Sequence, residues 1–236
     1  MRTKVSRIGV VGDVHTEDVR LHILLEFLAA QNTDKLYCVG DIADGKCHGD
    51  GSVDRCCQLL MEYNVPTVLG NHDQWCLNNV NRGVENATFV DTLTKESRSF
   101  LEALPMNYTL ETPRGDAMLC HGLGEYNMAS VYPTDSPDNI HNNLELWAIY
   151  RHTSLSFVIN GHSHRPDVHL FNHLAVINAG SLHDSGIASA VIIDFQLATA
   201  EFYRVNELSL VEHCVTKKCL TSESIFENQG GHHRRE

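Results

Sequence analysis

The chain has 236 residues, of which 42% are hydrophobic and 20% charged. This length and composition are those of an ordinary globular protein with one large domain or two small ones. The formal net charge of −12 argues against a protein that wraps long nucleic acid, which needs basic patches. A small phosphorylated substrate is not excluded, because bound metal ions can dominate the charge of a site.

The first residues and the cysteines indicate the compartment. The N-terminal apolar run spans only residues 8–11 and an acidic residue follows closely, so we expect no signal peptide. No apolar run approaches 18 residues, so no membrane partner or membrane-spanning helix is expected. Cys56 and Cys57 are adjacent, and Cys38 and Cys120 lie in strand-like runs. Reduced thiols and a cytoplasmic protein are therefore predicted.

Strands and helices alternate in the first part of the chain. Short apolar runs that end in glycine predict buried strands at 7–12, 35–40 and 65–70. Between them, helices are predicted at 15–31, where leucines recur at helical spacing, and at 53–64. This alternation predicts parallel strand pairing with helices covering the sheet.

The second part of the chain contains more strand than helix. A helix is predicted near 93–104, and residues 106–122 are typical of two strands joined by a turn. A helix over 136–152 follows, capped by Ser136 or Asp138, with proline in its first turn. Further strands are predicted within 156–162, 167–181, 188–195 and 199–205. Parallel α/β structure followed by more antiparallel strands predicts a two-sheet sandwich flanked by helices.

Polar residues of the metal-ligand type follow five of these apolar runs. They are Asp13, His15, Asp41, Asn71, His72, Asp73, His121, His162 and His164. One such residue would be typical of a turn or a cap, but the carboxyl ends of strands in an open α/β sheet line one crevice. Five sets of buried polar groups at one place must all be satisfied, and a metal cluster satisfies them together.

The number of donors indicates more than one ion. Two aspartates, one asparagine and four histidines exceed what one ion needs. A carboxylate such as Asp41 can bridge two ions, which lie about 3.5–4 Å apart in two-metal sites. Mixed imidazole and carboxylate ligation without thiolate suits manganese, iron, zinc, cobalt or nickel. We therefore expect two divalent transition metal ions as cofactors and do not choose among these elements.

The ordered pattern D-x-H, GD, GNH[DE], H and GHxH resembles the calcineurin-like metallophosphoesterase superfamily, in particular its small stand-alone phosphoesterase or phosphodiesterase type. The resemblance covers residues 8–181 and differs from the N-P-G-S stretch of small members at Ala179. It implies an α/β fold, a four-layer αββα sandwich of two mixed β-sheets flanked by helices. We expect a single domain over 1–225 and a flexible tail over 226–236.

The resemblance also implies a role for each site residue. One ion is held by Asp13, His15 and His164, the other by Asn71, His121 and His162, and Asp41 bridges them. His72 is a catalytic residue beside the leaving oxygen, oriented by Asp73. The implied reaction is hydrolysis of a phosphate ester by in-line attack of a metal-bound hydroxide, with His72 assisting the leaving group. Such a hydroxide is a strong nucleophile at neutral pH, and a positioned imidazolium can protonate an alkoxide.

Several residues outside the motifs have two interpretations. Asp44 and His48 could touch substrate, but a solvated loop is the favoured interpretation. His183 could contact the phosphate or lie on a surface turn. The long irregular connection at 121–137 is of a length that is often functional. Its candidates for shaping the substrate pocket are Tyr126, Asn127 and Tyr132.

The substrate class is inferred from missing arginines. Protein Ser/Thr phosphatases of this superfamily carry GDxVDRG and GNHE, whereas this chain has GDIADGK and GNHDQ. A guanidinium that bonds two oxygens is the best clamp for a monoester dianion, and a diester depends on it less. We therefore favour a small phosphodiester or nucleotide as substrate. Arg55, Arg82 or Arg165 could still supply a clamp, most plausibly Arg165, which follows His164 directly.

Three alternative functions compete with that of a phosphodiesterase. A phosphomonoester phosphatase of the same fold differs only in substrate. A non-catalytic scaffold protein is disfavoured because every ligand position and His72 are retained. A nuclease for long DNA is disfavoured by chain length and acidity. The sequence assigns no oligomeric state.

Overall fold

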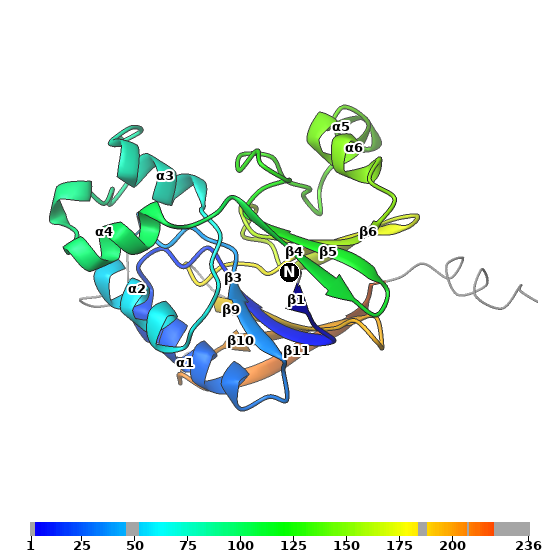
Figure 1. The fold of residues 1–236 in the computed structure, drawn as a ribbon, viewed down its shortest axis with the longest axis horizontal. Helices are drawn as coiled ribbons and strands as arrows, with labels where there is room; N and C mark the ends of the chain where they lie inside the picture. The colour runs from blue at the N-terminus through cyan, green and yellow to red at the C-terminus, as the bar shows by residue number, and fades with distance from the viewer. Residues whose placement is uncertain (1–2, 46–51, 184–187, 207, 220–236) are drawn as a thin grey trace, which may run out of the picture.

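The computed structural model describes residues 3–45, 52–183, 188–206 and 208–219 (Figure 1). Two β-sheets face each other, with helices on the outer side of each, so the predicted αββα sandwich of two mixed sheets is confirmed. One sheet contains β2 (Arg7–Val11), β3 (Lys35–Cys38), β9 (Ala188–Asp194), β10 (Thr199–Val205) and β11 (Val211–Lys218). The other contains β1 (Thr3–Lys4), β4 (Asn107–Thr112), β5 (Gly115–Cys120), β6 (Leu155–Asn160), β7 (Asp167–Phe171) and β8 (Leu174–Asn178).

Both sheets contain parallel and antiparallel pairs of strands. The first sheet has the order β11-β10-β9-β2-β3, and only β2 and β3 pair in parallel. The second has the order β1-β4-β5-β6-β8-β7, in which β5, β6 and β8 run parallel. The ends of β2 and β6 meet, since the backbone N–H of His162 donates to the carboxylate of Asp13 at 3.0 Å. Both sheets therefore present the carboxyl ends of their parallel strands to one edge.

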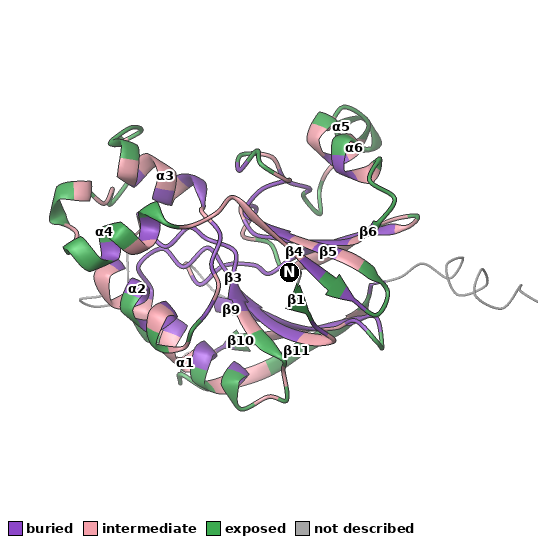
Figure 2. Ribbon diagram, viewed as in Figure 1, coloured by how far each residue is buried: buried purple, intermediate pink, exposed green. Residues whose placement is uncertain are grey.

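Alternating side chains of each strand enter two different cores. In β2, Ile8 and Val10 are buried between the two sheets, and Val11 is buried toward the helices. In β6, Phe157 lies between the sheets while Val158 faces the opposite layer. Figure 2 shows buried positions along the strands and exposed positions on the outer turns of the helices. Because successive side chains point to opposite faces of a strand, these short apolar strands form three cores: one between the sheets and one under the helices on each side.

Helices cover the outer face of each sheet. The helices α1 (Asp18–Ala29), α2 (Val53–Glu62), α3 (Asn71–Asn78) and α4 (Lys95–Glu102), with the 3-10 helix η1 (Val90–Thr92), share a core with the five-stranded sheet. The helices α5 (Pro137–His141) and α6 (Leu144–Tyr150) pack on the six-stranded sheet. No helix among the described residues combines the length and the apolar character needed to cross a membrane.

Two predicted elements differ from the structure. The predicted strand at 65–70 makes a single bridge, between Cys38 and Thr67, because Pro66 has no N–H to donate to a ladder. The predicted helix at 136–152 divides into α5 and α6, because the side chain of Asn143 accepts from the N–H of Leu146 and starts a second helix.

Four elements were not predicted from the sequence: the two-residue strand β1, the short 3-10 helix η1, the helix α3 and the strand β11. In α3 the buried positions carry Asn71, Asp73 and Cys76, so the helix has no apolar stripe. β11 is an edge strand whose residues are mostly exposed, and its apolar alternation is correspondingly weak. His48 and the predicted tail at 226–236 lie outside the described residues.

Phe157 provides a test of the core between the sheets. Its ring is fully buried and packs against that of Phe195, with ring centroids 5.0 Å apart. Phe157→Ala should lower the free energy of unfolding by about 3–5 kcal/mol, because it leaves a cavity between two rigid sheets. Urea denaturation measures the change. Leu197→Ala, at a side chain that is 66% exposed, should change stability by less than about 0.5 kcal/mol.

Candidate metal centre

The loops that carry the site residues have unusual backbone conformations. Positive φ angles occur at Asp13 (46°), His15 (46°), Asp41 (51°), Asp44 (58°), His162 (67°) and His164 (57°). A residue other than glycine held there costs of order 1–3 kcal/mol. Hydrogen bonds between loops hold these conformations: Asp13 N–H donates to Gly40 at 2.9 Å and His15 N–H to the Asp41 carbonyl at 2.8 Å. The loops at the strand ends therefore support one another.

One group of side chains surrounds Asp13. A ligand atom from each of Asp13, His15, Asp41 and His164 lies within 4.8 Å of the others. The Nε2 atoms of His15 and His164 are 3.2 Å apart, and His164 Nε2 is 3.3 Å from Asp13 Oδ1. Asp13, His15 and Asp41 are buried and His164 is partly exposed. The group is open toward solvent on the His164 side.

A second group surrounds Asn71. Its Oδ1 atom lies 2.9 Å from Nε2 of His121 and 2.9 Å from Nδ1 of His162. Asp41 joins the two groups, since its Oδ2 atom is 3.2 Å from His121 Nε2 and 3.8 Å from His15 Nε2. The structure thus brings together all the residues predicted as metal ligands, with Asp41 between the two sets.

The ring nitrogens of His15 and His121 fit a metal site. Nδ1 of His15 lies 2.7 Å from the carbonyl oxygen of Asp44, and Nδ1 of His121 lies 2.7 Å from that of Val39. A carbonyl oxygen only accepts, so each Nδ1 carries a hydrogen, and Nε2 is the atom of each ring that is left to bind a cation, either a proton or a metal ion. Lone pairs and carboxylate oxygens therefore converge on the same space, which a divalent cation suits.

The electrostatics of the group agree with this donor set. Burial lowers the pKa of His15 to about 4, so its ring is neutral at physiological pH. Burial also opposes a charge on His121, but the adjacent Asp41 carboxylate raises the pKa of His121 to about 10. Burial disfavours the Asp41 anion too, yet His121 and then His15 lower its pKa. The buried carboxylates thus attract positive charge to the point between the two groups.

His72 lies beside both groups without belonging to either. The backbone N–H of His72 donates to Asp41 Oδ1 at 2.8 Å, and the ring atom Nδ1 lies 2.9 Å from Asp44 Oδ2. The ring stands edge-on to that of His15, with centroids 4.9 Å apart and planes at 83°. Burial lowers the pKa of His72, but the bond to Asp44 and the Asp41 charge outweigh it and raise the pKa. The protonated form of the His72 ring is therefore favoured beside the two ligand groups.

The expectation that Asp73 orients His72 is wrong. The Asp73 carboxylate accepts the N–H groups of Ile42 and Ala43 at 2.8 and 2.9 Å, and that of Gly70 at 3.0 Å. Asp73 occupies the third position of α3, from which a side chain reaches back to the start of its helix. Its role is to join α3 to the loop that carries Asp41.

The carboxylate that contacts the His72 ring is that of Asp44, and not that of Asp73 as expected. Asp44 is only 1% exposed, so the favoured interpretation as a solvated loop is also wrong. Burial opposes its ionisation, but bonds from His72, the Thr88 N–H and Arg82 lower the pKa of Asp44. The only sequence signal for this role of Asp44 was its place three residues after Asp41 in GDIAD, a pattern that also occurs in many solvated loops.

Residues at the rim of the site come from two other segments. The ring of His183 lies 5.2 Å from that of His15, so this histidine faces the site. The segment 121–136 contains neither helix nor strand, as expected. The Asn127 amide donates to Gln74 of α3 at 3.1 Å and fastens this segment beside His72. Tyr126 and Tyr132 are 54% and 40% exposed.

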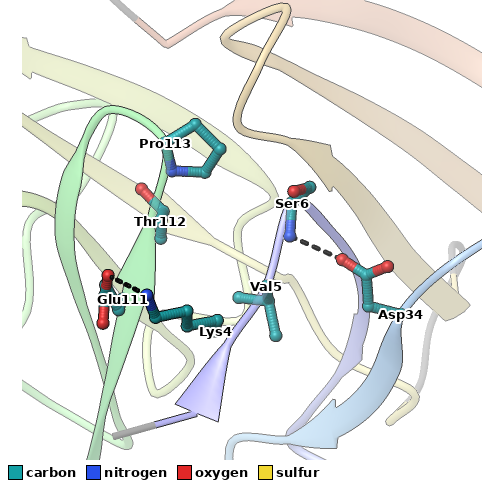
Figure 3. A pocket seen from close by; sticks show the side chains of 7 residues that line it. All are labelled: Lys4, Val5, Ser6, Asp34, Glu111, Thr112 and Pro113. Carbon is teal, nitrogen blue, oxygen red and sulfur yellow. Dashed lines mark hydrogen bonds and ion pairs between the residues drawn. The ribbon is translucent and has the colours of Figure 1, made fainter.

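A separate pocket of about 470 Å³ lies at the opposite edge of the sheets, beside the amino ends of β2 and β5 (Figure 3). Its polar groups pair with one another or with nearby backbone. Lys4 lies 3.1 Å from Glu111, and Asp34 accepts the backbone N–H groups of Ser6 and Arg7. These bonds fix the chain where it crosses from one sheet to the other, and they leave no converging ligand set.

Residues 7–197 match the family model of the calcineurin-like phosphoesterase superfamily domain. The chain belongs to this superfamily. The match contains the residues of both ligand groups together with His72 and Asp44. The protein is therefore a metallophosphoesterase, and its Asp and His residues form a group that could hold the divalent metals of this family.

The chain is similar in sequence to a known protein and in fold to solved structures. An uncharacterised protein of Methanocaldococcus jannaschii is 23% identical over 191 residues, which cover 75% of this chain and 70% of that one. A metallophosphoesterase from Sphaerobacter thermophilus is 20% identical with a TM-score of 0.63, covering 86% and 89% of the two chains. YfcE, a phosphoesterase from E. coli, is 15% identical with a TM-score of 0.55, covering 90% and 99%.

Gly161 tests whether the Asp13 carboxylate must keep its position. A Cβ atom at Gly161 would lie 2.3 Å from Asp13 Oδ2, closer than any real contact. Gly161→Ala should displace this carboxylate and lower the affinity for Mn²⁺ by roughly 10–100-fold, the usual effect of disturbing what supports a ligand. Calorimetric titration with Mn²⁺ measures the affinity.

Gly83→Ala is the matched control, since a Cβ atom there meets nothing within 4 Å. It should bind Mn²⁺ as the wild-type protein does. Equal Mn²⁺ affinity in the Gly161→Ala protein would show that Asp13 does not contribute to the metal centre.

Proposed function

We propose that the protein hydrolyses a phosphate ester with two divalent metal ions, and that the ester is a small phosphodiester or nucleotide. The observation that carries this proposal is the position of Asp41. Its Oδ2 atom faces His15 in one ligand group and His121 in the other, at 3.8 and 3.2 Å. A buried carboxylate between two sets of nitrogen and oxygen donors suits a pair of cations.

Each ligand group would hold one ion. Asp13, His15 and His164 suit the first, Asn71, His121 and His162 suit the second, and Asp41 suits both. Bound ions activate water and neutralise the charge on a phosphoryl group. The rigid loops hold these side chains in place, because their strained backbones are fixed by bonds between Asp13, Gly40 and His162.

His72 would move the proton of the reaction. Asp44 accepts the Nδ1–H of His72, which directs Nε2 away from Asp44 and makes it the atom that can donate to a leaving oxygen. The His72 side chain is 21% exposed, enough for contact with a bound substrate. Asp44 stabilises the imidazolium before transfer, and the ring becomes neutral as the leaving alcohol departs.

The arginines support a diester over a monoester. Arg55 pairs with Glu62 on the surface of α2 at 3.2 Å, and Arg82 pairs with Asp44 at 3.0 Å. Both guanidinium groups are thus engaged away from the phosphate. Exposed Arg165, directly after His164, is the remaining candidate for a clamp. One arginine suits a singly charged diester better than a dianion, which is best held by bidentate guanidinium contacts.

Aromatic side chains near His72 support a substrate with a flat ring. The indole of Trp75 packs against the His72 ring with centroids 4.6 Å apart. Tyr126 and Tyr132 are exposed on the segment that follows His121. Exposed aromatic rings close to a phosphoester site favour a nucleobase or aryl group by stacking.

The metal content and the substrate preference test this function. Protein stripped with a chelator should be inactive, and Mn²⁺ should restore turnover at two ions per chain. With the same metal, kcat/KM should be higher for an aryl phosphodiester than for the matched aryl phosphomonoester, because Arg165 alone among the candidate arginines is left to hold the dianion. A preference for the monoester would favour the phosphatase alternative. No turnover of any ester by metal-loaded protein would favour a scaffold.

His72 is tested by removing the proton donor alone. His72→Ala should keep both ions, since its side chain belongs to neither ligand group, and should lose roughly 10²–10⁴-fold in kcat. Metal analysis and steady-state kinetics check the two parts. Normal turnover, or loss of metal, would show that His72 has another role.

A further inference from the structure

Arg82 makes a fully hydrogen-bonded contact with Asp44. It lies on the segment 79–89 between α3 and η1, and its side chain is only 13% exposed. One NH group donates to Asp44 Oδ1 at 3.0 Å and the other to Oδ2 at 3.3 Å. The guanidinium also donates to the carbonyl oxygens of Thr88 at 2.6 Å and Val80 at 2.7 Å. Such a fork fixes the plane of a carboxylate as well as its charge.

Thr88 completes the grip on Asp44. Its N–H donates to Asp44 Oδ1 at 2.7 Å, and its hydroxyl accepts the N–H of Asp44 at 3.0 Å. Oδ1 is therefore occupied by Arg82 and Thr88, while Oδ2 is turned toward Nδ1 of His72 at 2.9 Å. The position of the imidazole follows from that of the carboxylate, and the position of the carboxylate follows from Arg82.

We propose that Arg82 is a positioning residue for proton transfer to the leaving group: it holds Asp44 so that His72 keeps its hydrogen on Nδ1 and presents Nε2 to the substrate. This inference rests on the proposed function of His72. Arg82 itself touches neither the ligand groups nor the space above them, since its contacts are with Asp44, Thr88 and Val80.

A purely structural role for Arg82 predicts a different result. The segment 79–89 is also fastened by a bond from Gly45 N–H to the carbonyl of Asn86 at 3.2 Å, which does not involve Arg82. Loss of the guanidinium should therefore leave the segment and the metal ligands in place. The substitution removes the cationic partner of the buried Asp44 carboxylate, and we expect this carboxylate then to lose its alignment with His72.

The test uses the full chain loaded with Mn²⁺ and two Arg82 variants. Arg82→Gln removes the charge, and Arg82→Lys keeps the charge but cannot bond both oxygens. Arg55→Gln is the matched control, because it makes the same change in an exposed ion pair at 3.2 Å on α2. Metal content and the urea midpoint are measured for each protein.

Kinetics with graded leaving groups give the first readout. Esters with poor alkyl leaving groups need protonation, and esters with good nitroaryl leaving groups need little. Arg82→Gln should lose roughly 10–100-fold in kcat with alkyl esters, part of the contribution of a general acid, and little with nitroaryl esters. Arg82→Lys should fall between wild type and Arg82→Gln. An equal loss with both classes, or a loss of metal, would overturn the proposal.

The second readout does not depend on turnover. In the wild-type protein the Nδ1–H of His72 should give a downfield proton NMR signal, assigned by its absence in His72→Ala. Arg82→Gln should shift or broaden this signal, and Arg55→Gln should leave it unchanged. An unaltered signal in both Arg82 variants would refute the positioning role. If wild type hydrolyses no phosphate ester, the proposed function fails, but this signal still decides whether Arg82 positions His72.

Discussion

Burial of four aspartate carboxylates at one edge of the sandwich is the constraint on which the rest of this site depends. Asp13, Asp41, Asp44 and Asp73 are each no more than 1% exposed. A buried carboxylate is strongly unfavourable unless it is paired and hydrogen-bonded. Two of the four are satisfied within the protein, Asp73 by three backbone N–H groups and Asp44 by Arg82, Thr88 and His72. The other two determine the chemistry.

Asp13 and Asp41 face imidazole nitrogens that carry lone pairs. Val39 and Asp44 accept the Nδ1 hydrogens of His121 and His15, so Nε2 is the atom of each ring that faces Asp41. Negative oxygens and electron pairs therefore gather where a cation is required. The same side of the protein has two kinds of aspartate: Asp13 and Asp41 face groups that could bind metal ions, and Asp73 and Asp44 hold the start of α3 and the ring of His72 in place.

Topology makes this gathering feasible. The parallel strands in both sheets bring their carboxyl ends to one edge, and left-handed residues such as Asp13 and His162 turn the side chains inward immediately after each strand. The strain of these residues is tolerated because the loops bond to one another across the two sheets. The rigidity that the chemistry needs thus comes from the sandwich, and a flexible loop would not retain it.

The sequence by itself determined the layered α/β architecture and which side chains meet at the site, because apolar periodicity and glycine-ended strands are local signals that survive in the fold. It did not reveal α3, which buries polar side chains, or β11, which is an exposed edge. It also assigned the orientation of His72 to its neighbour Asp73. Only the tertiary structure could decide that Asp44 has this role, because Arg82 and Thr88, 38 and 44 residues away, hold it beside His72. Contacts between distant segments depend on packing, which no local pattern records.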